Sequence, residues 1–252
     1  MKQLVIEELT KPGHAFLLPA RDRHYLIDVL RMKTGDTFPV LDACGNAFHA
    51  VIVRVQPDRV EARTVETAGH SLDPRGPEVT LFQALPKGRK IDDVLRGAVQ
   101  AGVTRFVPVL TERTIPRRMD DDTVRRERWS RICREAVQQS GATTIPEIDP
   151  VTRLADIRPS GGASLFLHTV PLEQASLHGY LDRGPATVDM VVGPEGGFSD
   201  LEIQFLLDLG FQPLFLGPRV LRTENAALFA LGAVQILLQE KKTWRLTEPA
   251  TS

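Results

Sequence analysis

Residues 188–203 read VDMVVGPEGGFSDLEI, and residues 213–231 read PLFLGPRVLRTENAALFAL. Each stretch runs from a short apolar strand through a glycine-proline loop into a helical segment. Ser199 and Glu202 have the spacing of a capping box, which predicts that a helix opens at Ser199. Strands that alternate with helices are typical of a mostly parallel sheet covered on both faces. These two stretches therefore place this part of the chain in the α/β class.

The same alternation begins near residue 79. Apolar runs at residues 79–85, 105–110 and 164–170 predict further strands. Apolar residues at helical spacing predict helices over residues 90–102 and 126–141, each stopping at a glycine. The last helix, from Thr223, is apolar nearly all round, and we expect it to be buried.

Residues up to about 73 show a different pattern, in which strands do not alternate with helices. Short β-like runs at residues 38–43, 48–55 and 59–65, separated by glycine, asparagine and proline, predict a small β-barrel or meander. A helical stretch precedes them and places Tyr25, Leu26, Val29 and Leu30 on one face. Residues 70–78, HSLDPRGPE, read as a linker. We therefore expect two domains, 1–73 and 74–252.

The composition narrows the classes of function. The 252 residues carry a net charge of −1, so a polyanionic partner would have to meet a local basic surface. The 2 cysteines and 6 histidines form no CxxC or HExxH motif, and we predict neither a metal site nor a disulfide framework. The first residues lack the apolar run of a signal peptide, and the longest apolar stretch is too short to span a bilayer. We therefore expect a cytoplasmic protein.

The two glycine-proline loops are the candidate ligand site. In open α/β sheets, ligands bind beyond the carboxyl ends of strands, where glycines let the backbone approach them. Each loop alone is also explained as a tight strand-to-helix turn. The polar residues beside the apolar strand ends favour a binding role, since a turn does not need them: Glu195, Arg219, Arg222, Thr223, Glu224 and Asn225. Neither loop matches a dinucleotide or P-loop motif.

A second feature is a basic segment. Residues 87–134 contain 13 Lys and Arg against 7 Asp and Glu, a local charge of +6. This excess suits binding to RNA phosphates, although a solvated helix face explains residues 125–134 equally well. A further basic patch on the predicted N-terminal helix contains Arg21, Arg23, His24 and Arg31, and Arg31 is alternatively a helix C-terminal charge.

These motifs together resemble the RsmE family, which are SPOUT-class methyltransferases of small-subunit ribosomal RNA. GPEGGFS at Gly193 and LGPRVLRTENAAL at Leu216 resemble the family's two signature loops. HYLIDVLRMKTGD at His24, LPKGRKIDDVLRGAVQAGV at Leu85 and QQSGATTIPEI at Gln138 resemble three further blocks, in the same order along nearly the whole chain.

The resemblance implies a PUA-like β-barrel at the N-terminus and a SPOUT domain with a C-terminal trefoil knot. It also implies a homodimer that uses S-adenosylmethionine (SAM) to methylate N3 of a uridine in 16S ribosomal RNA, within an assembled or partly assembled small subunit. The implied cofactor pocket comprises Leu167, His168, Gly193, Pro194, Glu195, Gly197, Leu216, Gly217, Arg219, Leu221, Arg222, Thr223 and Ala226. We assign RNA binding to Arg21, Arg23, His24, Arg31, Lys87 and Arg113.

The chemistry requires removal of the uracil imide proton and stabilisation of the charge that develops on a carbonyl oxygen, with no metal. Arg219 and Arg222 are the candidates for that stabilisation, and Arg219 is the one we assign. Glu195 and His168 are candidate bases, and solvent is a third candidate. The chain departs from the family pattern at Gly97, Gln100, Gln138 and Ala142, which bears on RNA docking and on the target nucleotide. The alternatives are a SPOUT methyltransferase acting on tRNA or on a ribose 2′-hydroxyl, and a non-catalytic ribosome assembly factor.

Overall fold

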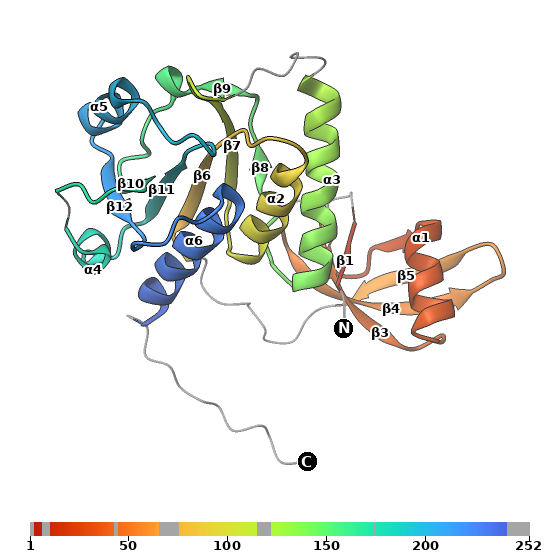
Figure 1. Ribbon diagram of the computed structural model, residues 1–252. Helices are drawn as coiled ribbons and strands as arrows, with labels where there is room; N and C mark the ends of the chain where they lie inside the picture. Colours follow the sequence, from red (N-terminus) through yellow and green to blue (C-terminus); the bar gives the residue numbers. More distant parts are fainter. Residues whose placement is uncertain are drawn as a thin grey trace. The chain divides into compact units, whose positions relative to one another are not determined.

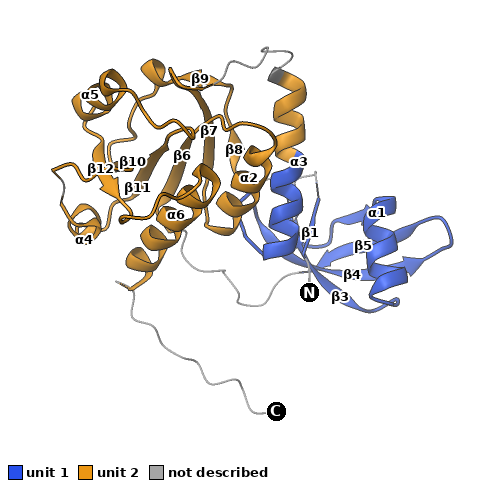
Figure 2. Ribbon diagram, viewed as in Figure 1, with its two compact units in different colours: residues 1–74, 131–145 blue, residues 75–130, 146–252 orange. Residues whose placement is uncertain are grey.

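The computed structural model describes residues 3–6, 11–42, 45–65, 76–114, 122–173 and 175–240 (Figure 1). The chain divides into two compact units, coloured separately in Figure 2. Unit 1 comprises Met1–Pro74 and Arg131–Ile145, and unit 2 comprises Arg75–Ser130 and Pro146–Ser252. The predicted linker at residues 70–78 lies mostly outside the described residues.

Unit 1 contains a sheet of five described strands in the order β1-β3-β4-β5-β2. Only the β1–β3 pair is parallel. Alternate residues of the strands face one core, in which Phe38, Ile52 and Val60 are completely buried. The strands are β1 (Leu4–Val5), β2 (Ala15–Leu17), β3 (Thr37–Leu41), β4 (Ala47–Val55) and β5 (Val60–Val65).

The predicted N-terminal helix is present but presents a different face. It consists of α1 (Ala20–Arg23) followed by the π-helical turn η1 (His24–Val29). The amide of Leu30 donates to the carbonyl of Tyr25, five residues back, at 3.0 Å. This wider turn breaks the α-helical spacing on which the predicted face depends. Leu26 is therefore buried, whereas Val29 is 57% exposed, so the two residues do not share one face as predicted.

Unit 2 contains a parallel sheet in the order β12-β10-β11-β6-β7-β8, with β9 beside β7. Its longer strands lie at the apolar runs that predict strands. They are β6 (Glu78–Ala84), β7 (Arg105–Leu110), β8 (Glu147–Ile148), β9 (Thr152–Arg153), β10 (Ala163–His168), β11 (Thr187–Val192) and β12 (Gln212–Phe215). The helical segments are α2 (Lys90–Gln100), α3 (Asp122–Ser140), η2 (Leu154–Asp156), α4 (Leu177–Leu181), α5 (Asp200–Asp208) and α6 (Thr223–Glu240). The part of α3 from Arg131 onward belongs to unit 1.

Both faces of this sheet are covered, as predicted. Phe82, Phe166 and Val191 lie at matching positions on β6, β10 and β11 and form one core cluster with Leu206 of α5. The residues that precede them in each strand point to the opposite face and are also buried. Figure 1 shows α2 and α6 side by side in front of the sheet.

The packing of α2 against α6 depends on Gly97. A Cβ atom at this position would lie 2.0 Å from Cδ2 of Leu228, so the bare glycine allows the two helices to approach closely. Gly97, one of the departures from the family pattern, is therefore a packing residue in the interior of unit 2.

The last helix is only half buried in a single chain. Ala227, Ala230 and Val234 are completely buried, but Phe229 is 60% exposed and Ile236 is 59% exposed. The expectation of burial is thus met by one face of α6. No helix in the described part of the chain is long and apolar enough to cross a membrane.

Candidate functional site

The parallel strands of unit 2 end at one edge of the sheet, and a cavity lies there. β10 ends at His168, β11 at Val192 and β12 at Phe215. The loops that follow β11 and β12 form most of the wall of a cavity of about 510 Å³. Pockets for small molecules and cofactors usually measure about 300–1,000 Å³, so the volume suits a nucleoside-sized ligand.

The structure brings all the residues of the expected cofactor pocket around this single cavity. They come from three segments that are distant in the sequence: the end of β10, the loop after β11, and the loop after β12 with the start of α6. The lining contains Leu167, His168, Gly193, Pro194, Glu195, Gly197, Leu216, Gly217, Arg219, Leu221, Arg222, Thr223 and Ala226.

A buried polar chain fixes the two loops to each other. The hydroxyl of Thr223 donates to the carbonyl of Gly193 at 2.7 Å and accepts a hydrogen bond from the Gln83 side-chain amide at 3.0 Å. Gln83 and Thr223 are both buried, and a buried polar group without a partner is costly. These contacts hold the first residue of α6 beside the ends of β6 and β11, in the middle of the sheet.

Glycines shape the wall where a side chain would intrude. Gly217 has a φ of +114° and Gly197 a φ of +68°, a region of the backbone map that favours glycine. A Cβ atom at either residue would meet no atom within 4 Å. These glycines are therefore required by backbone conformation, and the space beside them is open for a ligand.

Glu195 lies in an ion-pair network at the rim. Its carboxylate accepts hydrogen bonds from Lys90 Nζ at 2.8 Å and from the Lys87 amide at 3.2 Å. Lys90 Nζ also lies 3.9 Å from Glu224. Burial acts to raise the pKa of Glu195, but the hydrogen bonds from Lys90 and from two backbone amides outweigh it and lower the pKa. A carboxylate with a lowered pKa is a weaker base.

The two arginines of the second loop, unlike Glu195, lie outside this ion-pair network. Arg219 and Arg222 line the cavity and are exposed, and within the described ranges neither side chain forms an ion pair or hydrogen bond. Glu195 and Glu224 instead share Lys90. His168 Nδ1 lies 2.8 Å from the carbonyl oxygen of Val170 and 3.2 Å from the amide nitrogen of Val170, and Nε2 has neither contact.

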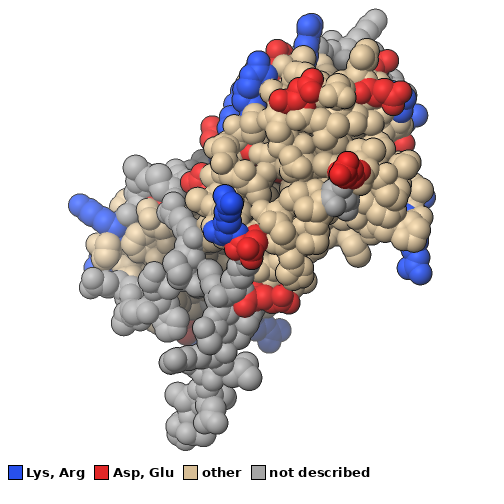
Figure 3. Space-filling view, turned by 90° about the vertical axis from the view of Figure 1, so that its left-hand side faces the viewer, with Lys and Arg blue, Asp and Glu red and all other residues tan. Residues whose placement is uncertain are grey.

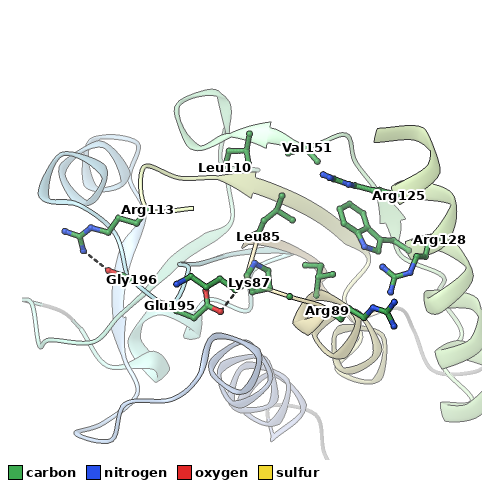
Figure 4. A pocket seen from close by; sticks show the side chains of 14 residues that line it. Leu85, Lys87, Arg89, Leu110, Arg113, Arg125, Arg128, Val151, Glu195 and Gly196 are labelled. Carbon is green, nitrogen blue, oxygen red and sulfur yellow. Dashed lines mark hydrogen bonds between the residues drawn. The ribbon is translucent and has the colours of Figure 1, made fainter. Parts of the chain in front are cut away.

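A second cavity of about 490 Å³ adjoins the first and shares Arg113, Glu195 and Gly196 with it. It is formed by the loop between β6 and α2, the end of β7 and the start of α3. In Figure 4, Arg89, Arg125 and Arg128 lie toward α3, whereas Glu195 and Gly196 lie at the opposite end. Arg113 donates a hydrogen bond to the Gly196 carbonyl at 2.7 Å, which ties the end of β7 to the first loop.

The predicted RNA-binding residues fall into two groups. Lys87 and Arg113 line the second cavity of unit 2. Arg21, Arg23, His24 and Arg31 belong to unit 1, where Arg21 pairs with Glu135 at 2.9 Å and both Arg23 and His24 lie near Asp28. On the face shown in Figure 3, the basic and acidic side chains of the described residues are interspersed, without a continuous basic patch.

Several residues of the site are missed by reading the sequence alone. Lys90 holds both Glu195 and Glu224, and Arg89 and Trp129 line the second cavity. The available signal is the run Lys87-Gly88-Arg89-Lys90, a basic turn between a strand and a helix. Within the described ranges, no group of three or more histidine, cysteine or acidic residues is placed to hold a metal ion.

Comparison with known proteins agrees with this architecture. Residues 74–235 match the model of an RNA methyltransferase domain, and residues 18–65 match that of an RNA methyltransferase PUA domain. A relative named ribosomal RNA small subunit methyltransferase E, from Synechocystis, is 35% identical over 221 residues, covering 86% of this chain and 71% of the relative. A protein of the same name from Bacillus subtilis is 27% identical, covering 90% of this chain and 93% of the relative.

A solved structure extends the likeness to three dimensions. The ribosomal RNA small subunit methyltransferase E of Neisseria gonorrhoeae, crystallised with bound S-adenosylmethionine, superposes with a TM-score of 0.81 and is 30% identical. The match covers 94% of this chain and 98% of the Neisseria chain. The mixed α/β chain with its PUA-like N-terminal domain therefore belongs to the RNA methyltransferase family that includes the ribosomal RNA small subunit methyltransferase E proteins.

Proposed function

We propose that this protein transfers a methyl group from SAM to N3 of a specific uridine in 16S ribosomal RNA. The observation that carries the proposal is the cavity at the strand ends, whose lining joins two glycine loops around a nucleoside-sized space. The Neisseria relative binds SAM, and the relatives are named for methylation of small-subunit ribosomal RNA. In this assignment the N-terminal domain, residues 1–73, binds RNA, and residues 74–252 carry the reaction.

The residues of the cavity fit SAM chemically. Leu167, Leu216 and Leu221 offer apolar surface, and the backbone at Gly193 and Gly217 is accessible for hydrogen bonds. SAM supplies an activated methyl group bound to a sulfonium, so the protein has to orient the uracil and manage its charge. Arg219 stabilises the negative charge that develops on a uracil carbonyl, because its guanidinium keeps its charge and is not engaged by a described carboxylate.

Glu195 is a weaker candidate for the base than the sequence alone suggests. Its lowered pKa and its ion pair with Lys90 suit a residue that orders the first loop. We propose that Glu195 serves mainly in this way and that the imide proton leaves to solvent or to the free nitrogen of His168. Gly193, Gly217 and the other lining residues hold the cofactor.

We assign residues 74–252 to the SPOUT class, with a trefoil knot. Two observations support it. β12 lies at the edge of the sheet, yet α6, which follows it, begins beside β6 and β11 in the centre. The connecting residues 216–222 therefore cross the ends of β10 and β11, as a threaded chain would require.

We further propose that the protein acts as a homodimer on an assembled or partly assembled small subunit. The exposed residues Phe229 and Ile236 lie seven positions apart on α6 and thus on one face. An apolar stripe of this kind is suited to burial against a second copy. The preference for an assembled subunit rests on the need to select one uridine by its surroundings.

Nucleoside analysis tests the reaction directly. We expect 16S ribosomal RNA from a deletion strain to lose one N3-methyluridine, and the purified protein with SAM to restore it on small subunits. Loss of a 2′-O-methyl group or of a tRNA modification would instead support one of the alternative methyltransferases. Undetectable SAM binding by calorimetry would contradict the assignment and favour a non-catalytic assembly factor.

A further inference from the structure

The second cavity of unit 2 has an apolar floor. Leu85, Ile91 and Leu110 line it together with Trp129, which is 3% exposed. These residues come from the β6–α2 loop, α2, β7 and α3, so the floor is built by four separate segments. Figure 4 shows Leu85 and Leu110 between the two ends of the cavity. A planar, weakly polar group such as a nucleobase is suited to this surface.

The rim of the same cavity is strongly basic. Lys87, Arg89, Arg113, Arg125 and Arg128 line it, and Glu195 is the one acidic residue among the described residues of the lining. Lys90 already pairs with that carboxylate. Arg128 is oriented by an ion pair with Asp92, a buried residue of α2. An apolar floor below several cations, of which Arg113 and Arg128 are held by Gly196 and Asp92, matches the chemistry of a nucleotide, which combines a flat base with an anionic phosphate.

The position of this cavity connects it with the proposed cofactor site. Arg113, Glu195 and Gly196 line both cavities, so a ligand in the second one lies beside the loop that follows β11. The hydrogen bond between Arg113 and Gly196 holds this shared wall in place. A base that leaves the RNA stack and enters here meets the cofactor cavity at its Glu195 end.

We propose that the second cavity receives one unstacked nucleotide of the RNA substrate, with its phosphate among Arg89, Arg125 and Arg128 and its base extending over the floor from beside Trp129 toward the Glu195 end. This inference rests on the proposed function, because it assigns the nucleotide that the reaction requires to a specific cavity. Enzymes that modify a base in structured nucleic acid take it out of the stack and into a pocket.

The intrinsic fluorescence of Trp129 provides the test. The chain has 2 tryptophans, and the other, Trp244, lies outside the described residues. A full-length Trp244→Phe variant therefore reports on Trp129 alone. We expect uridine 5′-monophosphate to change this fluorescence saturably, uridine to do so with lower affinity, and inorganic phosphate to produce no change while competing weakly with the nucleotide.

Two neighbouring arginines of α3 supply a matched pair of variants. Arg125 lines the cavity, whereas Arg126 is exposed and does not line it. In the Trp244→Phe background, Arg125→Ala should weaken nucleotide affinity about tenfold, the loss typical of one charge-assisted hydrogen bond. Arg126→Ala should leave that affinity unchanged. SAM affinity, measured by calorimetry, should be unaffected in both variants, which also shows that they are folded.

The outcomes separate this inference from the proposed function. If the protein binds SAM and methylates ribosomal RNA but the nucleotide leaves Trp129 fluorescence unchanged, the cavity assignment is wrong and the function stands. Equal losses in Arg125→Ala and Arg126→Ala would also overturn it, since they would indicate a diffuse electrostatic effect. A phosphate affinity equal to that of the nucleotide would overturn it as well, because the cavity would then bind anions without recognising a base. Failure to bind SAM would contradict the proposed function itself.

Discussion

Arg219 is an exposed cation in the lining of the cavity at the strand ends. Its position follows from the turn after β12, where Gly217 and Pro218 end the strand and the next residue is exposed beside the cavity. Lys90 is the cation that pairs with both neighbouring carboxylates, Glu195 at 2.8 Å and Glu224 at 3.9 Å. Holding the loop through an ion pair is therefore not a role that the structure gives to Arg219.

Replacing Arg219 should affect turnover more than cofactor binding. Its charge is most useful after the uracil has lost its proton, so the interaction belongs to the transition state. We expect Arg219→Ala to lower the single-turnover methylation rate by at least ~10-fold, or about 1.4 kcal/mol of barrier, with little change in SAM affinity. Parallel losses of rate and affinity would show that the side chain only shapes the pocket.

Gly217 makes a different contribution, through its backbone. Its φ of +114° is strained for a β-branched residue, and the added side chain would project into the open space beside the cavity. Gly217→Val should therefore abolish SAM binding in a calorimetric titration. Gly210→Val is the matched control, because Gly210 has a φ of +88° and equally open surroundings but lies outside the cavity lining. If both variants lose SAM binding, strain alone explains the effect.

At the scale of elements, local patterns predict most of what the structure contains. Apolar periodicity locates the longer strands and helices of unit 2, although it misses the short elements β8, β9, η2 and α4. The capping box of α5 is present, with Ser199 accepting from the Glu202 amide. The π-helical turn after α1 is not predictable from spacing, because it changes the spacing itself. The second cavity also escapes prediction, since its walls come from segments that only the sheet order brings together.

The contact between α2 and α6 can be tested with a double-mutant cycle at Gly97 and Leu228. Alanine is favoured over glycine within a helix by about 1 kcal/mol, but a Cβ atom at Gly97 would overlap Leu228. We expect Gly97→Ala to lower the free energy of unfolding in the native background and to raise it in a Leu228→Ala background. Urea denaturation of the four proteins gives the coupling energy. Additive effects would mean that Leu228 moves aside without cost and that the close approach is unimportant.

At the scale of the whole molecule, the half-exposed helix α6 predicts a dimer. Phe229→Glu would place a charge in an apolar interface, so light scattering should show a monomer at micromolar concentration where the native protein is a dimer. Leu201→Glu is the control, because Leu201 on α5 is 81% exposed and isolated from this stripe. A native protein that is monomeric and fully active would contradict the proposal.

The hydrogen bond between Gln83 and Thr223 joins residues that are 140 positions apart. During synthesis the chain emerges from its N-terminal end, so β6 leaves the ribosome long before the partner of its Gln83 exists. The wall of the cavity formed by residues 216–226 arrives with α6, the last described helix. A nascent chain can therefore complete the sheet of unit 1 early, but it acquires a place for a ligand only after residues 216–226 have left the ribosome.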